Sequence, residues 1–346
     1  MGSDLSLALR MLWNARVYAT TAIVTLAVCI GANAAIFTIV NSVLLKPLPV
    51  PDAGSIVLMA NNYPNAGSAV AGNNSGAPDY YDRLRDMTVF EEQAMYAGRA
   101  LPVENKGSPD LVRGMAATPS LFRLLKIPPA LGRAFDASEG EIGSEQKVIL
   151  SSGLWREMYA ADPEVLGKDM QLAGRPYTIV GVMPDTFQFA DAEARFWIPL
   201  AFTAEEKSDD RRHSNNWSHV GRLKPGATVE QAQAQVDAIN AANLERFPQW
   251  RELLINAGFR TTVEPLQDVL VRNVARTLYL LWGGAAFVLL VGALNIANLA
   301  LARSTLRAKE LCTRVALGAA HGRIARQLVV EGLIVALIAA VLGAAI

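Results

Sequence analysis

The stretch VYATTAIVTLAVCIGANAAIFTIVNSVLL, residues 17–45, decides the fold of this 346-residue chain, because its 29 consecutive residues carry no charge. A helix rises about 1.5 Å per residue and needs about 20 residues to cross the hydrocarbon core of a bilayer. The stretch therefore predicts a transmembrane helix. A cleaved signal peptide is the alternative, with Ala32-Asn33-Ala34 as its cleavage site. The apolar region of a signal peptide covers only about 7–15 residues, however, and this one continues to Leu45.

Two later stretches repeat the pattern. Residues 277–302 are 26 uncharged residues without a polar face, which predicts a second transmembrane helix rather than a buried helix of a soluble protein. Residues 332–346 are also uncharged and predict the start of a third transmembrane helix, so we expect a chain that is a fragment or is truncated at its C-terminus. Charged residues make up only 18% of the chain, below the roughly 25% that is usual for soluble domains.

The charges orient the chain. The total of 32 Lys and Arg against 32 Asp and Glu excludes a strongly basic nucleic-acid-binding protein. By region, residues 1–16 carry +1, residues 46–276 carry −5 and residues 277–346 carry +4. Because positive flanks stay in the cytoplasm, we expect residues 1–16 and 303–331 to be cytoplasmic and residues 46–276 to lie outside.

The two predicted cytoplasmic segments each allow two interpretations. Residues 1–16 suit an interfacial helix with Trp13 at the level of the headgroups, or a plain extension of the first span. Residues 303–331 predict two helical segments broken at 318–322. This basic loop would either dock on a cytosolic partner or only fix the topology and contact anionic lipid.

The predicted exported region, residues 46–276, is typical of a mixed αβ domain of two lobes, the second covering about 217–265. The pattern predicts a hairpin turning at Ala173-Gly174 and a helix capped by Thr228 with Gln231 three residues later. The whole chain is therefore expected to be membrane α-helical plus α+β. Its two cysteines, Cys29 and Cys312, lie outside the domain, which excludes a disulfide framework there.

The sequence offers little catalytic chemistry. It contains no GxxxxGK[ST] and no HExxH motif, so we expect no enzymatic activity and no cofactor in this chain. His213 and His219 could bind a metal, but without nearby cysteines we expect surface residues instead. Ser151 lies between a predicted strand and a predicted helix without the GxSxG elbow, which favours a helix cap over a nucleophile.

Four asparagines fall inside the predicted spans: Asn33, Asn41, Asn295 and Asn298. An amide in lipid is costly without a partner, so we expect these side chains to face other helices and to form interhelical hydrogen bonds. A polar substrate pathway is the alternative, although no charged relay accompanies them.

Four segments resemble one family of proteins. They are IGANAAIFTIVNSVLLKPLPVPD (30–52), LGKDMQLAGRPYTIVGVMPDTFQF (166–189), GRLKPGATVEQAQAQ (221–235) and LNIANLALARSTLRAKELCTRVALGAAHGRIARQLVVEG (294–332). In this order they resemble the MacB-like and FtsX-like permeases of ABC transporters, which carry a MacB-type periplasmic core domain.

The resemblance implies a permease subunit that transmits ATP-driven motion from a separate cytosolic ATPase to the periplasmic domain, for efflux or extracytoplasmic signalling. By position it assigns the ATPase-coupling role to five residues of the cytoplasmic loop: Glu310, Arg314, Leu317, Gly318 and Ala319. It also implies a location in the bacterial inner membrane with residues 46–276 in the periplasm, a homodimer or pairing with a second permease half, and a possible periplasmic partner. A membrane-anchored periplasmic interaction or scaffold module without transport is the alternative function. No feature of the sequence selects a substrate.

Overall fold

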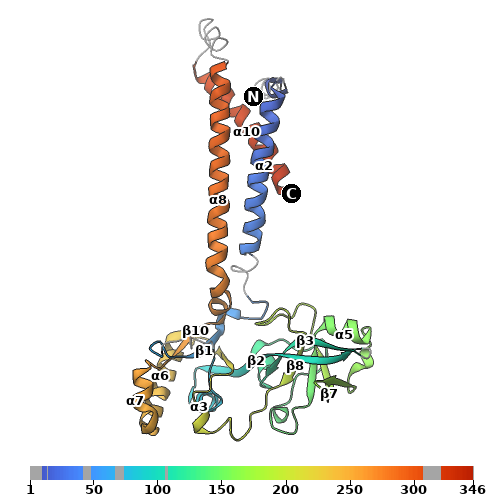
Figure 1. The fold of residues 1–346 in the computed structure, drawn as a ribbon, viewed down its shortest axis with the longest axis vertical. Helices are drawn as coiled ribbons and strands as arrows, with labels where there is room; N and C mark the ends of the chain where they lie inside the picture. Colours follow the sequence, from blue (N-terminus) through green and yellow to red (C-terminus); the bar gives the residue numbers. More distant parts are fainter. Residues whose placement is uncertain are drawn as a thin grey trace. The chain divides into compact units, whose positions relative to one another are not determined.

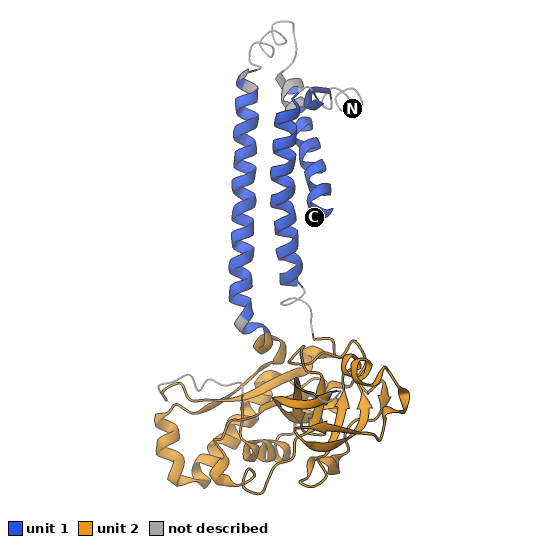
Figure 2. Ribbon diagram, turned by 45° about the vertical axis from the view of Figure 1, so that its right-hand side comes forward, with its two compact units in different colours: residues 1–46, 271–346 blue, residues 47–270 orange. Residues whose placement is uncertain are grey.

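The computed structural model describes residues 10–13, 15–41, 48–66, 74–105, 108–306 and 321–345. The chain divides into two compact units, which Figure 2 shows in different colours. Unit 1 consists of residues 1–46 and 271–346, and unit 2 consists of residues 47–270. Each unit is described by itself.

Unit 1 is helical (Figure 1). Its helices are α2 (Arg16–Val40), α8 (Leu266–Leu306, whose first residues belong to unit 2) and α10 (His321–Ala345). Residues 10–13 are also helical. Within the described residues, Arg16–Val40 and Val274–Arg303 are long and apolar enough to cross a membrane, and Val329–Ala345 is a shorter apolar helix.

One helix boundary differs from the predicted spans. Helix α8 begins at Leu266, before the expected start of the second span at residue 277. The reason is that Leu266 and Val269 pack in the core of unit 2, so the helix starts inside that unit and not at the edge of the uncharged stretch. Within the predicted loop 303–331, α8 continues to Leu306 and α10 begins at His321, while residues 307–320 lie outside the described residues.

Unit 2 is built on one mixed sheet of ten strands, with the order β10-β1-β9-β2-β3-β8-β5-β7-β4 and with β6 pairing with β2 and β7. The pairs β3–β8 and β5–β7 are parallel and the others are antiparallel. The strands are β1 (Ile56–Asn62), β2 (Phe90–Asn105), β3 (Ser108–Ala117), β4 (Leu131–Gly132), β5 (Lys147–Leu150), β6 (Asp169–Leu172), β7 (Arg175–Val182), β8 (Phe196–Pro199), β9 (Ser218–Leu223) and β10 (Arg260–Pro265).

In the described part of unit 2, five α-helices and four short 3₁₀-helices accompany the sheet. The α-helices are α3 (Ala77–Asp86), α4 (Leu121–Leu125), α5 (Ser152–Tyr159), α6 (Val229–Arg246) and α7 (Pro248–Asn256). The 3₁₀-helices are η2 (Ala53–Ser55), η3 (Ala137–Gly140), η4 (Pro163–Val165) and η5 (Asp209–Arg211).

The predicted second lobe, about 217–265, does not form a sheet of its own. Strand β9 lies between β1 and β2, and β10 pairs with the other edge of β1. Backbone hydrogen bonds thus join strands from both ends of the region into one sheet.

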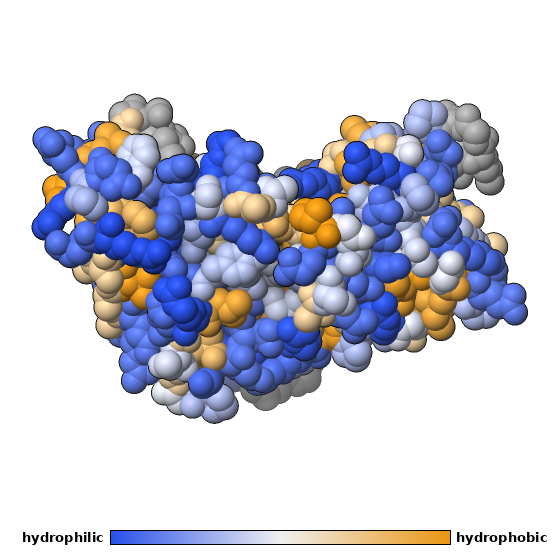
Figure 3. Space-filling model, turned by 90° about the horizontal axis from the view of Figure 1, so that it is seen from below, coloured by the Kyte–Doolittle hydropathy of each residue, from blue (hydrophilic) through white to orange (hydrophobic). Residues whose placement is uncertain are grey.

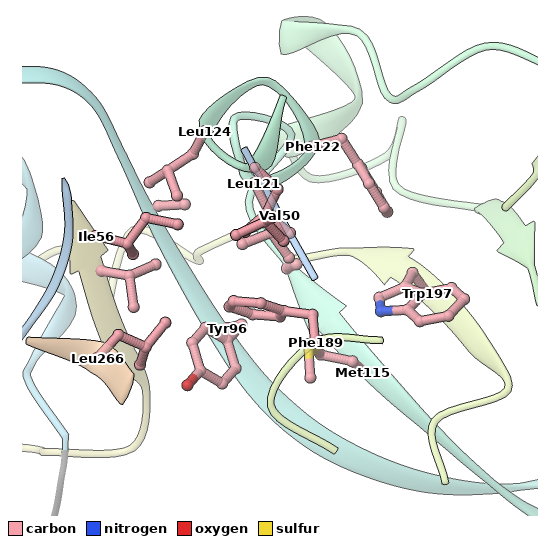
Figure 4. Close-up of a cluster of buried hydrophobic side chains, with 14 of the residues drawn as sticks. Val50, Ile56, Tyr96, Met115, Leu121, Phe122, Leu124, Phe189, Trp197 and Leu266 are labelled. Carbon is pink, nitrogen blue, oxygen red and sulfur yellow. The ribbon is translucent and has the colours of Figure 1, made fainter. Parts of the chain in front are cut away.

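Both faces of the sheet are covered by apolar residues. Ile56, Leu58 and Ala60 of β1 belong to one hydrophobic cluster, while Val57 and Met59 belong to another, together with residues of α6. Successive side chains of a strand point to opposite faces, so this alternation places a core on each side. Figure 4 shows the first cluster, in which side chains of α4 lie over Tyr96, Phe189 and Met115 of the sheet region.

Several local predictions are confirmed. Strands β6 and β7 form the expected hairpin, and Ala173 and Gly174 at its turn both have positive φ, as two-residue hairpin turns of type I′ require. Thr228 accepts from the backbone N–H of Gln231 and caps α6 in a capping box. Ser151 accepts from the N–H of Leu154 and caps α5, which agrees with its interpretation as a helix cap.

We expect Gly114→Ala to destabilise unit 2, because a Cβ on Gly114 of β3 would lie 2.5 Å from the buried ring of Phe196. Crowding of this kind costs about 1–3 kcal/mol. The matched control is Gly98→Ala on the neighbouring strand β2, where a Cβ meets nothing within 4 Å. Urea unfolding of the detergent-solubilised chain, followed by tryptophan fluorescence, measures both variants. Equal midpoints for Gly114→Ala and Gly98→Ala would contradict the packing described for β3 and β8.

Candidate functional site

One predicted interhelical asparagine joins two helices of unit 1. The Asn33 Nδ2 of α2 donates a hydrogen bond to the backbone oxygen of Ala285 on α8 at 2.8 Å and another to that of Cys29 at 3.0 Å. Ala285 lies within a helix, where its carbonyl oxygen can accept one hydrogen bond from the helix backbone. The Asn33 amide uses the second lone pair of that oxygen. In a lipid environment this contact satisfies a polar group that would otherwise be buried without a partner.

Small residues let the helices of unit 1 approach closely. A Cβ on Gly292 of α8 would lie 2.8 Å from the Sγ of Cys29, and a Cβ on Gly343 of α10 would lie 2.7 Å from the backbone oxygen of Ala27. Helix association in membranes depends on such packing, because lipid supplies no hydrophobic force between helices. The two glycines thus bring α8 and α10 against one helix, α2.

The other predicted site residues lie elsewhere. Asn41 follows the last residue of α2 and is exposed, and Asn295 and Asn298 are exposed on α8. The described residues therefore bring only Asn33 against another helix. The five predicted coupling residues, Glu310, Arg314, Leu317, Gly318 and Ala319, lie outside the described residues.

Unit 2 contains a buried polar cluster that the sequence did not indicate. Its centre is Arg83 of α3, which is 1% exposed. One Nη donates to Asn61 Oδ1 at 2.8 Å and to Thr261 Oγ1 at 3.1 Å, and the other donates to Ser75 Oγ at 2.9 Å. The cluster therefore ties α3 to β1 and β10.

A second arginine, Arg212, is held by three carboxylates. It forms ion pairs with Asp82, with Asp209 and, at 3.4 Å, with Asp79. Asp79 also accepts from Asn61 Nδ2 at 2.6 Å, which links this group to the contacts of Arg83. Burial of two cations is tolerable because Asp79 and Asp82 are buried beside them and balance their charge, although the Nε of Arg212 has no hydrogen-bond partner among the described residues.

His219 of β9 completes the cluster, and the prediction that it is a surface residue is wrong. Its side chain is 0% exposed. The Gln93 Nε2 donates to the Arg83 backbone oxygen at 3.0 Å, so Gln93 Oε1 accepts from His219 Nε2 at 3.1 Å. We assign the Nε2–H tautomer on this ground. His219 Nδ1 then accepts from Arg83 Nη1 at 3.2 Å.

The same contacts explain the charge state of the histidine. Burial lowers the pKa of His219 well below its ordinary value of 6.5, and the neighbouring Arg83 guanidinium lowers it further. His213 was also predicted at the surface, but it is half-buried and hydrogen-bonds through Nδ1 to the Tyr63 hydroxyl at 2.7 Å. The error arose because polar neighbours in sequence indicate exposure only when no strand or helix packs over them.

A groove lies beside this cluster and has a volume of about 420 Å³. Apolar, aromatic and acidic side chains line it together: Tyr63, Ala66, Asp209, Asp210, His213, Ser214, Asn215, Trp250, Leu253, Leu254 and Ala257. Burial raises the pKa of Tyr63 to about 12, so its hydroxyl stays protonated. The face of the molecule drawn in Figure 3 is mostly hydrophilic, with separate hydrophobic patches.

The described residues contain no group of three or more His, Cys, Asp or Glu side chains that could hold a metal ion. His213 and His219 use their Nδ1 atoms on Tyr63 and Arg83. The arrangement supports folding and recognition, and we derive no catalytic step from it.

The sequence matches two known families. Residues 19–239 match the family described as MacB-like periplasmic core domain, and residues 282–346 match the family described as FtsX-like permease C-terminal. The macrolide export ATP-binding/permease protein MacB of Neisseria meningitidis serogroup B is 25% identical over 279 residues, which are 75% of this chain and 40% of that protein. The probable export ATP-binding/permease protein MacB of Pseudomonas entomophila is 27% identical over 268 residues, 75% of this chain and 38% of that protein.

The chain thus spans about two fifths of the length of these curated relatives. Among solved structures, the periplasmic region of MacB from Actinobacillus actinomycetemcomitans has a TM-score of 0.43 and 12% identity, covering 64% of this chain and 93% of that one. The extracellular domain of the noncanonic ABC-type transporter YknZ from Gram-positive bacteria has a TM-score of 0.41 and 13% identity, covering 60% of this chain and 99% of that one.

The buried His219 predicts a pH dependence of stability. Its folded-state pKa is depressed, so the unfolded chain binds the additional proton once the pH falls below about 6.5, and the free energy of unfolding decreases there. The contribution is fully present above pH 6.5. We expect His219→Gln to reduce the slope of stability against pH between about 6.5 and 5.5, by at most about 1.4 kcal/mol per pH unit for one proton.

Urea unfolding of the solubilised chain at several pH values measures this slope. The control is His321→Gln, which changes the histidine at the start of α10 in unit 1. A slope that is the same in His219→Gln and in the unsubstituted chain would show that His219 is not buried in its neutral form.

Proposed function

Because the chain belongs to the family of permeases with a MacB-like periplasmic core domain and an FtsX-like permease domain, we propose that it is the permease subunit of an ABC transporter. In this role it transmits ATP-driven motion from a cytosolic ATPase to a periplasmic domain, for efflux or extracytoplasmic signalling. The observation that carries the proposal is the chain order. The apolar helix α2 precedes unit 2 in the chain. Helix α8 begins at Leu266 within unit 2 and continues as one helix through the second apolar stretch.

The contacts between the helices favour transmission of motion from helix to helix rather than a polar pathway for a substrate. The Asn33 side chain donates to a backbone oxygen of the facing helix, Gly343 places α10 against the backbone of α2, and Gly292 places α8 against the Cys29 side chain of α2. Helices that pack this closely displace one another when one of them moves. Asn295 and Asn298 are exposed in the single chain, and we propose that a second copy or a second permease half covers them.

The charge distribution supports an orientation. We propose that residues 1–16 and 303–331 lie in the cytoplasm and residues 46–276 in the periplasm, because the first two segments carry a net positive charge and the third a net negative one. ATP binding would then reside on a separate cytosolic subunit that contacts Glu310, Arg314, Leu317, Gly318 and Ala319. The groove beside Tyr63 and Trp250 offers a surface for a periplasmic partner.

A membrane-anchored interaction module without transport is the second candidate function. The same groove favours it, because a recognition surface on unit 2 needs no ATP-driven motion of the helices. The two functions differ in whether an ATPase accompanies the chain.

We expect an ATPase subunit to remain bound to the tagged chain when it is solubilised from the membranes of its own host. Arg314→Glu should lower the amount retained at least about tenfold, because reversing the charge of an interface arginine costs the 1.4 kcal/mol of a tenfold affinity change or more. Mass spectrometry and ATP hydrolysis of the purified material measure the retention. The matched control is Arg99→Glu, an exposed arginine of unit 2. Retention of the ATPase at the same level in Arg314→Glu would refute the coupling role, and its absence from the unsubstituted chain would favour the interaction module.

The orientation has its own test. We expect Ser144→Cys, at an exposed position of unit 2, to react with a membrane-impermeant maleimide in intact cells when Cys312 is replaced by Ser. The chain that keeps Cys312 and lacks Ser144→Cys should react only after the cells are lysed. The reverse pattern of labelling would invert the proposed topology.

A further inference from the structure

One ion pair joins the two helices that flank residues 307–320. The Nη1 of Arg303, near the end of α8, lies 3.3 Å from the Oε2 of Glu331 on α10. The two side chains are 15% and 8% exposed. At such burial the pair is not a solvated surface contact, and reversing the charge of either partner places two like charges side by side.

The same guanidinium contacts two further segments of unit 1. Its Nη2 donates to the backbone oxygen of Met11 at 3.0 Å, and its Cζ lies 4.7 Å from the ring centroid of Tyr18 on α2. A cation over an aromatic face is attracted most strongly where water is excluded. Arg303 of α8 therefore connects α10, α2 and the helical residues 10–13.

A cluster of apolar side chains lies on the same helices, one to two turns from the pair. It contains the buried residues Leu12, Ala22 and Val335, with Tyr18, Ala19, Ile23, Leu26, Ile296 and Ile334 packed against it. Val335 follows Glu331 by one helical turn, and Ile296 precedes Arg303 by two turns on the same face. The low polarity of this cluster strengthens the attraction between the two charges.

The pair also occupies a special place in the sequence. Arg303 is the first charge after the uncharged residues 277–302, and Glu331 is the last charge before the uncharged residues 332–346. The segment between the two helices, 307–320, contains the predicted coupling residues. The ion pair thus lies at the ends of the two uncharged stretches that face the segment.

We propose that Arg303 and Glu331 are a positioning pair that holds α8 and α10 together beside α2. With the pair intact, a displacement of the 307–320 segment moves α8, α10 and α2 as one body. With the pair broken, the displacement separates α8 from α10 and does not reach α2. That an ATPase causes this displacement rests on the proposed function. The role of the ion pair in holding the helices rests only on the contacts within unit 1.

Distances between spin labels on α8 and α10 test the pair in the full chain. The labels go on Leu301→Cys and Val329→Cys, two exposed positions close to the pair, with Cys29→Ala and Cys312→Ser as the background. We expect a narrow distance distribution that Arg303→Glu and Glu331→Arg each broaden or lengthen, because each places two like charges together. The double variant that carries both Arg303→Glu and Glu331→Arg should restore the narrow distribution.

The milder variant Glu331→Gln serves if the reversed charges prevent insertion, and Arg10→Gln is a matched control on an exposed arginine. Unchanged distances in the single variants would overturn the proposal. A disturbance that persists in the exchanged pair would also overturn it.

A second measurement separates this proposal from the proposed function. In the complex with its ATPase, we expect ATP with vanadate to change the distance between labels on Val24→Cys of α2 and Leu290→Cys of α8. Glu331→Arg should abolish that change and retain the ATPase, whereas Arg314→Glu should lose the ATPase and keep the α8–α10 distance. An ATPase absent from the unsubstituted chain would refute the proposed function, and the α8–α10 distances would still decide the role of the pair. A normal ATP-dependent change in Glu331→Arg would refute the role of the pair alone.

Discussion

The antiparallel pairing of β1 with β10 is the constraint on which unit 2 depends. Six residues of each strand pair in register, from Val57 with Pro265 to Asn62 with Arg260, although about 200 residues separate them in the chain. Closing so long a loop is costly in entropy, and the cores on both faces of β1 must offset it. The pairing places the entrance and the exit of unit 2 side by side, where Gln267 Oε1 accepts from the backbone N–H of Leu48 at 3.1 Å.

The buried polar cluster depends on this pairing. Asn61 of β1 and Thr261 of β10 stand opposite each other in the register, and both contact Arg83. The cluster can exist inside the unit because its charges balance and its histidine stays neutral. It is specific to one register, since a shift of one residue would turn both side chains to the other face of the sheet.

Unit 1 is held together in a different way. Lipid does not drive helices together, so contacts at Gly292 and Gly343, one amide hydrogen bond from Asn33 and the Arg303–Glu331 ion pair organise its three helices. The polar contacts lie at separate levels of α8 and form no continuous polar path among the described residues. This arrangement supports the proposed transmission of motion between helices.

The sequence by itself determined the features that depend on neighbouring residues. Uncharged runs fixed the apolar helices, the Ala173-Gly174 turn fixed one hairpin, and Thr228 and Ser151 fixed two helix starts, because span length, turn geometry and capping are local. Family membership also followed from the order of four segments, and the comparisons confirm it.

Only the tertiary structure decided which distant segments meet. It joined the two predicted lobes through β9 and β10, buried His219 against Arg83, and brought Arg303 to Glu331. The reason is that burial and charge pairing depend on contacts between residues far apart in the chain. A polar residue such as His219 carries no local sign of the strand and the arginine that will enclose it.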